Sequence, residues 1–348
     1  MRLIRRQLNR TLLLRQHLLT RVDWHPHQMI HHLLGLQAQD NLPPYLSLAA
    51  RLSSFHPSVV SDGLGDRTLV RMVVMRGTIH LLTADDALAL RGWTQPCQVR
   101  ERKVSQNTRP GLHLPAAAVA AAVAAVLEDG PLPVKALGEA LSAHFPDVPP
   151  SVLAHLARVD APLAQLPPRG QWKATGRVVY HLVDRWVGRP LLAPSPAALV
   201  RRYLAAFGPA SGADVGAWSG LSGMSQVLAG IDGVELHEDE AGRCLYDVPG
   251  APLADGDEPA PVRLLGLYDN VWLSHATRDR VTEPAKRHRW MGRTGGLANT
   301  VFVDGMLEGL WRVADGRPVV VELFRDLSRR EQAELDGELA RVEQLLGM

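Results

Sequence analysis

The sequence predicts an α+β fold built from several compact units. Three observations support this prediction. Short helical segments followed by strand-like segments recur along the chain, the C-terminal part is rich in strands and turns, and the composition is that of a globular protein. The chain has 348 residues, of which 46% are hydrophobic and 21% are charged. This length is sufficient for about two to four compact units with hydrophobic cores.

Each copy of a weak internal repeat contains three predicted helices, the first ended by a Gly-Pro stop, and then two strand-like segments. In the first copy these elements span 116–128, 134–144, 151–159, 172–175 and 178–180. In the second copy they span 196–207, 214–218, 222–229, 234–237 and 244–248. Three short helices followed by a two-stranded hairpin are the pattern of a winged helix-turn-helix unit. Such units commonly bind DNA, although they also serve as protein-interaction modules.

A third unit of this kind is expected at the N-terminus. Helices that run through Arg15 and Leu34 precede a strand candidate at 77–82. Thr83 with Asp86 resembles a capping box that starts another helix. We therefore expect three tandem winged helix-turn-helix units and a C-terminal part, with the boundaries 1–112, 113–192, 193–258 and 259–348.

The C-terminal part is expected to form an antiparallel, barrel-like sheet closed by a helix. Asp304-Gly305 separates two strand-like segments and is typical of a type I′ hairpin turn. The predicted strands are 262–267, 271–273, 300–303, 306–313 and 319–323, and the predicted helix is 328–346.

The positive charge of the chain is carried almost entirely by arginine. Lysine occurs only at positions 103, 135, 173 and 286, and the formal net charge is +2. Arginine binds phosphate bidentately and stacks on bases, which suits a nucleic-acid partner. A GC-rich genome also favours arginine codons, so both explanations stay open.

The sequence also limits the compartment and the kinds of site. Cys97 and Cys244 are the only cysteines, so no disulfide framework or thiolate zinc site is expected. Arginines interrupt the apolar residues near the N-terminus, and no uncharged apolar run is long enough to span a bilayer. We therefore expect a cytoplasmic protein without membrane association and without an obligate protein partner.

Gln37 and Gln39 are the most informative residues of the chain. They end an apolar helical segment and precede Pro43-Pro44, which cannot continue a helix, so the chain can extend here. Residues i and i+2 of an extended chain project to the same side, so both amides could reach one target. Glutamine does not titrate, so such a site would orient its substrate rather than abstract a proton. The alternative is that the amides only cap a helix end.

Two further groups of polar residues lie in the N-terminal part. Arg76, Thr78 and His80 would share one face of a probable strand, where they either line the site of the glutamines or form a solvated face. His27 and His31 have the spacing of zinc ligands. Because no acidic third ligand or cysteine accompanies them, we expect no metal and no other cofactor.

A basic segment follows in the C-terminal part, ending in Gly295-Gly296. Its polar and charged residues are Asp269, Asn270, His275, Arg278, Asp279, Arg280, Lys286, Arg287, Arg289 and Arg293. Several cations in a glycine-containing loop would neutralise phosphates and make binding fall with salt. The alternative is a solvated surface loop in which Asp279 offsets part of the charge.

Four segments together resemble a bacterial family of tandem winged-helix DNA glycosylases, which includes enzymes that unhook azinomycin-type interstrand crosslinks and confer self-resistance. The segments are 36–39, 49–51, 76–80 and 269–280. The resemblance covers essentially the whole chain. Its most specific element is the Gln-x-Gln motif, in place of which some relatives carry Gln-x-Asp. It implies three winged-helix motifs, a barrel-like C-terminal part and a hairpin that inserts into DNA.

The resemblance implies that Gln37 and Gln39 are catalytic in a monofunctional DNA glycosylase. The partner would be double-stranded DNA with cationic alkylpurine lesions or interstrand crosslinks. A purine alkylated at N7 already carries the charge of a good leaving group. Two amide carbonyls could then place a water and stabilise the oxocarbenium ion. A bulky adduct also requires an open site.

The residues expected to contact the DNA are Arg51, Arg76, Thr78, His80, His275, Arg278, Arg280, Lys286, Arg287 and Arg289. The alternative function is that of a winged-helix transcriptional regulator or another non-enzymatic DNA-binding protein. Such a protein would prefer one DNA sequence, whereas a glycosylase would prefer lesions.

Overall fold

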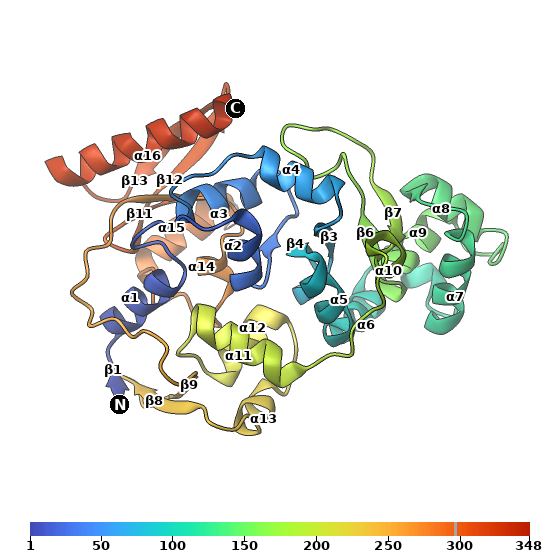
Figure 1. Ribbon diagram of the computed structural model, residues 1–348, viewed down its shortest axis with the longest axis horizontal. Coiled ribbons are helices and arrows are strands. Elements are labelled where there is room, and N and C mark those ends of the chain that lie inside the picture. The colour runs from blue at the N-terminus through green and yellow to red at the C-terminus, as the bar shows by residue number, and fades with distance from the viewer. Residues whose placement is uncertain (296–297) are drawn as a thin grey trace.

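The computed structural model describes residues 1–295 and 298–348 and has the mixed α and β content that the sequence predicts. Helices α7 (Ala116–Val126), α8 (Val134–Leu141) and α9 (Pro150–Asp160) lie at one end of the molecule (Figure 1). The C-terminal helix α16 (Arg329–Gly347) lies at the other end. No helix in the described part of the chain is long and apolar enough to cross a membrane.

The first 112 residues supply the helices and strands around Gln37. The helices are α1 (Arg5–Arg15), α2 (Pro26–His32), α3 (Pro43–Arg51), α4 (Ser58–Gly65), α5 (Ala84–Trp93) and α6 (Gln95–Val104). The strands are β1 (Arg2–Leu3), β2 (Leu36–Gln37), β3 (Leu69–Val73) and β4 (Ile79–Thr83), and the short 3-10 turns are η1 (Met75–Gly77) and η2 (Arg109–Gly111). The predicted cap of α5 is confirmed, because the Thr83 hydroxyl accepts a hydrogen bond from the Asp86 N–H at 3.3 Å.

The first repeat copy contains the three predicted helices α7, α8 and α9 around an apolar core of its own. The other elements are β5 (Leu132–Pro133), β6 (Leu163–Gln165), β7 (Val179–Leu182) and α10 (Val183–Val187). The strand predicted at 172–175 is wrong, and β6 pairs with β7 instead. Trp172 packs its ring against Tyr45, with 4.7 Å between the ring centroids, so this segment serves tertiary packing.

The second repeat copy has the same order of elements. They are α11 (Pro196–Phe207), α12 (Gly212–Ser219), α13 (Met224–Ala229), β8 (Glu235–Asp239) and β9 (Cys244–Asp247). In both copies a short segment after the first helix pairs with the last strand, as β5 does with β7 and Ala210 does with Tyr246. The repeat therefore extends to strand pairing. The N-terminal β1 adds to this copy by pairing in parallel with β8.

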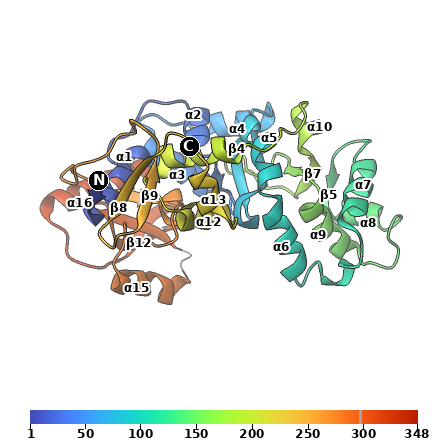
Figure 2. The same cartoon turned by 90° about the horizontal axis from the view of Figure 1, so that it is seen from below.

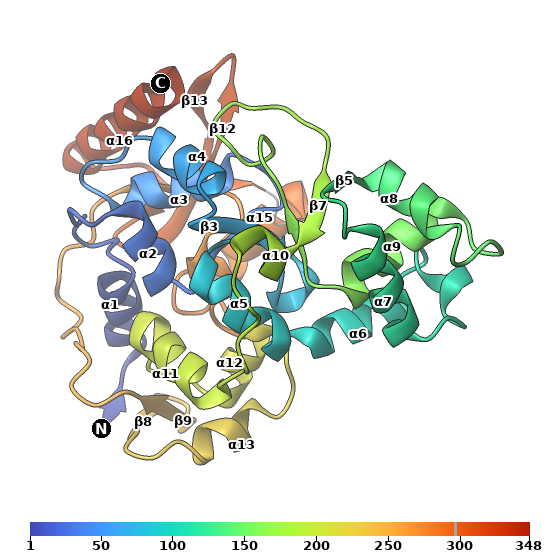
Figure 3. The same ribbon diagram turned by 45° about the vertical axis from the view of Figure 1, so that its right-hand side comes forward.

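One sheet connects the N-terminal part to the first repeat copy. It has six strands in the order β2-β4-β3-β6-β7-β5, and β3 joins β6 through the antiparallel partners Arg71 and Gln165. Figure 3 shows β3, β7 and β5 leading from the centre of the molecule toward α8. The strand β2, which carries Gln37, is at one edge of this sheet.

The C-terminal sheet is open in the described part of the chain. Its strands are β10 (Arg263–Leu265), β11 (Asn299–Val303), β12 (Met306–Ala314) and β13 (Arg317–Leu323), in sequential order. The predicted barrel is therefore not confirmed. Asp304 and Gly305 have φ angles of 46° and 73°, as the predicted type I′ turn requires. Helix α16 covers the sheet through Leu335, Val342 and Leu345.

Two segments of the C-terminal part differ from prediction. Residues 271–273 belong to helix α14 (Asn270–Leu273), which the Asp269 carboxylate caps by accepting from the Val271 N–H at 3.0 Å. The predicted basic loop is largely helix α15 (Pro284–Thr294), which lies beside β12 (Figure 2). Its proline occupies the first turn, where no intrahelical N–H bond is lost. The predicted Gly296 and the side chain of Arg293 lie outside the described residues.

Candidate active site

A tight turn at the C-terminus of helix α2 leads the chain to Gln37. Leu34 has a left-handed φ of 51°, and the Gly35 N–H donates to the Ile30 carbonyl at 2.9 Å. This pattern is the Schellman motif, which ends a helix and redirects the chain. Gly35 has φ of 97°, and a Cβ there would lie 3.1 Å from the Leu81 carbonyl oxygen. The turn thus places β2 against β4.

Gln37 is buried and pairs with His80 across the β2–β4 ladder. Its side-chain Oε1 accepts a hydrogen bond from Arg76 Nη2 at 2.8 Å. Because a guanidinium group only donates, the atom that faces Arg76 must be the amide oxygen. The Thr78 hydroxyl lies 3.3 Å from the same oxygen and 3.0 Å from the Met75 carbonyl, so its single proton is shared between them.

Gln39 is exposed and binds the same segment. The Ala38 N–H donates to the Ile79 carbonyl at 2.7 Å, and the Ile79 N–H donates to Gln39 Oε1 at 2.9 Å. The Gln39 amide therefore extends the ladder beyond β2. Both glutamines are thus held by residues 76–79, and the strand residues line the same site as the glutamines rather than a separate solvated face.

The half-buried Arg76 and the buried His80 form the floor of the site. The His80 Nδ1–H donates to the Thr78 carbonyl at 3.0 Å, which leaves Nε2 to accept from Arg76 Nη2 at 3.1 Å. Burial and the nearby Arg76 charge lower the pKa of His80 to about 3, so the ring is neutral. Burial lowers the pKa of Arg76 to about 10, so the guanidinium stays charged at pH 7.

Two backbone features of the second repeat copy complete this floor, and neither is predictable from the local sequence. The Trp218 carbonyl accepts a hydrogen bond from Arg76 Nη1. Gly220 lies against the Arg76 backbone, and a Cβ at this glycine would be 2.8 Å from the Arg76 Cα. The only sequence signal was a glycine just after a helix, which is common to many helix ends.

Three residues predicted to contact DNA are structural instead. Arg51 is 0% exposed and forms an ion pair with Asp269 at 2.7 Å, so its charge is already compensated inside the protein. His275 and Arg280 are buried near Asp214, whose carboxylate pKa they lower although burial alone would raise it. A buried side chain in such a network cannot reach a phosphate without leaving its partners unpaired.

The remaining predicted cations differ in how accessible they are. Lys286 pairs with Glu308 at 2.6 Å, and Arg289 pairs with Glu322. Arg287 is exposed on α15, whereas Arg278 is half-buried. Burial and the charge of Arg287 lower the pKa of Arg278, and the charge of Arg278 in turn lowers that of Arg76. Arg278 is therefore close enough to both Arg76 and Arg287 for their charges to interact.

The predicted histidine pair has protein partners. His27 Nε2 lies 2.7 Å from the Thr68 hydroxyl, and His31 Nδ1 lies 3.1 Å from the Asp86 carboxylate. Within residues 1–295 and 298–348, no three His, Cys, Asp or Glu side chains are grouped as metal ligands would be.

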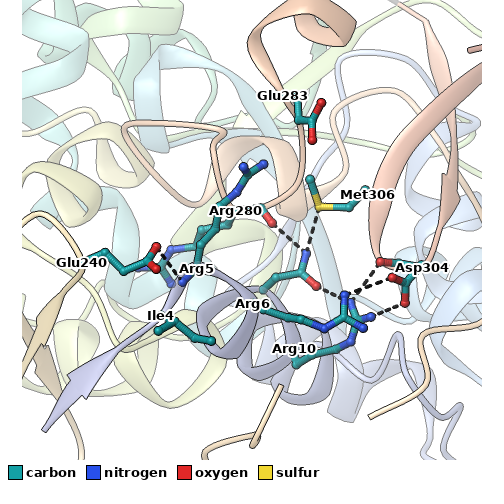
Figure 4. Close-up of a pocket in the computed structure, with 10 residues that line it drawn as sticks. Ile4, Arg5, Arg6, Arg10, Glu240, Arg280, Glu283, Asp304 and Met306 are labelled. Carbon is teal, nitrogen blue, oxygen red and sulfur yellow. Dashed lines mark hydrogen bonds and ion pairs between the residues drawn. The ribbon is translucent and has the colours of Figure 1, made fainter. Parts of the chain in front are cut away.

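A cavity of about 420 Å³ lies between α1 and the β11–β12 turn (Figure 4). Several arginines line it, but protein acceptors already hold them. Arg6 and Arg10 pair with Asp304, and Arg5 donates to the Thr282 carbonyl at 3.2 Å. These contacts link α1 to the C-terminal part, so we interpret the cavity as part of the packing interface between them.

The fold and the sequence together define the class of protein. The chain belongs to the AlkZ-like DNA glycosylases, because residues 30–345 match the family described as "DNA glycosylase AlkZ-like". A particular relative, the "Interstrand DNA cross-link repair glycosylase" of Streptomyces sahachiroi, is 26% identical over 362 residues, which cover 96% of this chain and 94% of that protein. The family resemblance seen in the sequence is therefore confirmed.

A solved structure shows the same overall fold. Streptomyces sahachiroi DNA glycosylase AlkZ matches this chain with a TM-score of 0.76 and 23% sequence identity. The match covers 100% of this chain and 98% of that one. The mixed α and β architecture is thus shared along the whole length.

Proposed function

We propose that this DNA glycosylase hydrolyses the N-glycosidic bond of N7-alkylated purines and unhooks interstrand crosslinks, with Gln37 and Gln39 at its active site. The observation that carries the proposal is the attachment of both amides to residues 76–79, with Gln39 exposed beside the buried Gln37. The name of the Streptomyces sahachiroi relative supports the crosslink substrate.

The chemistry suits a site without a titrating base. Water attacks C1′ as the bond from C1′ to N9 breaks, and the bonding electrons neutralise the positive charge of the N7-alkylated base. The proton of the water passes to solvent. Neutral His80 and charged Arg76 do not exchange protons near pH 7. Rate enhancement therefore comes from placing the water and from oriented dipoles.

The duplex would lie across several parts of the chain. We assign the two repeat copies to winged-helix units on the basis of their helix order and strand pairing, and residues around β2–β4 to a third. Arg278 and Arg287 would contact phosphates near the lesion. A groove of about 950 Å³ beside α9 is mainly apolar, with Lys135, Glu139, Arg158 and Arg177 also lining it, and would take the flanking duplex. Lys135 and Arg158 already have carboxylate partners in Glu139 and Glu101, so Arg177 would be the main phosphate contact.

The direct test is base release from DNA that carries N7-alkylguanine or an interstrand crosslink, with abasic sites revealed by alkali. The double variant Gln37→Ala, Gln39→Ala should lose release, whereas Gln332→Ala on the surface of α16 is the matched control and should not. Release that persists in the double variant would contradict the active-site assignment. Stronger binding to one DNA sequence than to lesions would instead favour a regulator.

We also propose a biological role for this activity. Unhooking of crosslinks would protect a cell that makes a DNA-alkylating natural product. Because bacterial DNA lies in the cytoplasm, we propose that the protein acts there. Cells that carry the gene should survive a crosslinking agent better than cells that carry the double glutamine variant.

A further inference from the structure

We propose that Arg76 is a positioning residue that makes the two glutamines act as an unlike pair. Gln37 would act as the hydrogen-bond donor, and Gln39 as the acceptor, toward the attacking water. This inference rests on the proposed function and assigns a separate role to each amide. It also replaces the prediction that Arg76 contacts DNA.

Arg76 is held in place through both its backbone and its side chain. Its backbone has a left-handed φ of 56°, and Gly220 packs against that backbone. Nη1 is held by the Trp218 carbonyl, and Nη2 divides its two protons between Gln37 Oε1 and His80 Nε2. With both terminal nitrogens engaged, the guanidinium cannot turn toward a phosphate without giving up these partly buried hydrogen bonds.

Arg76 sets the orientation of the Gln37 amide. A flipped amide would place its NH2 group against Arg76, so that two donors would face each other. The oxygen of Gln37 therefore points inward, and Nε2 is left without an acceptor in the described part of the chain. This nitrogen is not fully buried, so a water can reach it.

Gln39 Oε1 can accept one more hydrogen bond. Its Oε1 takes one hydrogen bond from the Ile79 N–H, and a carbonyl oxygen can accept two. A water between the glutamines would thus accept from Gln37 Nε2 and donate to Gln39 Oε1. These two bonds orient a lone pair of the water toward the sugar, without any transfer of charge to the protein.

Two isosteric variants separate the roles. Gln37→Glu keeps an inward oxygen for Arg76 but presents an acceptor where the donor was, so we expect base release to fall by about 10²–10³-fold, as for loss of a positioned donor. Gln39→Glu keeps the acceptor, so its rate of base release should fall by at most about tenfold. Its rate should also become dependent on pH in the acid range, because protonation removes the charge of the carboxylate and turns one of its oxygens into a hydrogen-bond donor.

Arg76 is tested by Arg76→Met and Arg76→Lys. With Arg76→Met the amide is free to flip, so we expect the rate constant of base release to fall while the KM for damaged DNA stays within about twofold. Arg76→Lys keeps a charged donor and should recover part of the loss. Circular dichroism and the melting temperature report on folding, and the glutamate variants leave Arg76 intact should Arg76→Met unfold.

The outcomes distinguish this inference from the proposed function. Activity that survives the double alanine variant would overturn both. If the double variant is inactive but Gln37→Glu releases base as well as Gln39→Glu does, only the unlike-pair assignment fails. A rise in KM with an unchanged rate constant in Arg76→Met would restore Arg76 as a DNA contact.

Discussion

Replacing Arg51 by alanine is expected to lower the free energy of unfolding by about 3–5 kcal/mol, because it leaves a buried carboxylate without its partner. Arg51 Nη1 and Nη2 donate to Asp269 at 2.7 and 2.8 Å, and Nη2 also donates to Gln16 at 2.9 Å. The exposed fractions of the two side chains are 0% and 1%. Water therefore cannot replace the lost hydrogen bonds unless the core opens.

The size of the loss depends on pH in a way that identifies its origin. Burial alone would raise the pKa of Asp269, but the charge and hydrogen bonds of Arg51 hold this pKa below its ordinary value of 3.8. The pair therefore stabilises the fold fully above pH 3.8, and this contribution is lost as the pH falls through the lowered pKa. In Arg51→Ala, burial is no longer offset and raises the pKa of Asp269 above 3.8, so protonation removes the unpaired charge before pH 4 is reached and the difference from wild type should be smaller at pH 4 than at pH 7.

Urea unfolding followed by circular dichroism at pH 7 and pH 4 measures these free energies, and fluorescence anisotropy with a labelled duplex measures DNA affinity. Arg287→Ala is the matched control, since Arg287 is an exposed arginine on α15. It should weaken DNA binding and leave unfolding unchanged, whereas Arg51→Ala should do the reverse. An Arg51→Ala protein of wild-type stability with much weaker DNA binding would refute the structural assignment.

Four further substitutions at single positions have expected outcomes. Gly138→Ala in α8 should destabilise the fold by about 1–3 kcal/mol, because its Cβ would lie 2.9 Å from the Pro150 carbonyl carbon. A Cβ at Gly337 in α16 would meet no atom within 4 Å, so Gly337→Ala should stabilise the fold by about 0.5–1 kcal/mol. Equal melting temperatures of the two glycine variants would contradict both expectations. The pKa of His80 is about 3 in the folded protein, below its ordinary value of 6.5, so the free energy of unfolding should fall as the pH is lowered from 6.5 to 3. The slope from this residue is up to about 1.4 kcal/mol per pH unit. In His80→Phe, urea unfolding measured over the same pH range should show a smaller dependence on pH. Arg287→Glu should reduce the dependence of log Kd on log salt by about one unit or more in binding titrations, and an unchanged slope would remove Arg287 from the interface.

Local signals in the sequence located most helices. Gly208-Pro209 ends α11, and Ser328 caps α16 by accepting from the Glu331 N–H, as residue type and spacing indicate. The two positive φ angles at Asp304-Gly305 also follow from residue type. Each of these features depends on a few neighbouring residues, so one sequence is enough to predict it.

Features that depend on distant residues were not predictable in this way. The burial of Arg51 is set by Asp269, which is 218 positions away in the chain, and an exposed arginine has the same local sequence. The short apolar run 271–273 is equally compatible with a strand and with one helical turn. The orientation of Gln37 depends on Arg76, and the Arg76 side chain is held by a carbonyl of the second repeat copy.

The shared sheet limits how such a protein can be recombined. The pairing of β3 with β6 makes the first repeat copy a continuation of the strands that carry Gln37 and His80. A cut near residue 112 would expose the edge of β3 at Arg71 and Met72, which invites pairing with another chain. Exchange of this copy between relatives would therefore have to preserve the β3–β6 register, so substrate range would evolve more readily by side-chain replacement than by module swapping.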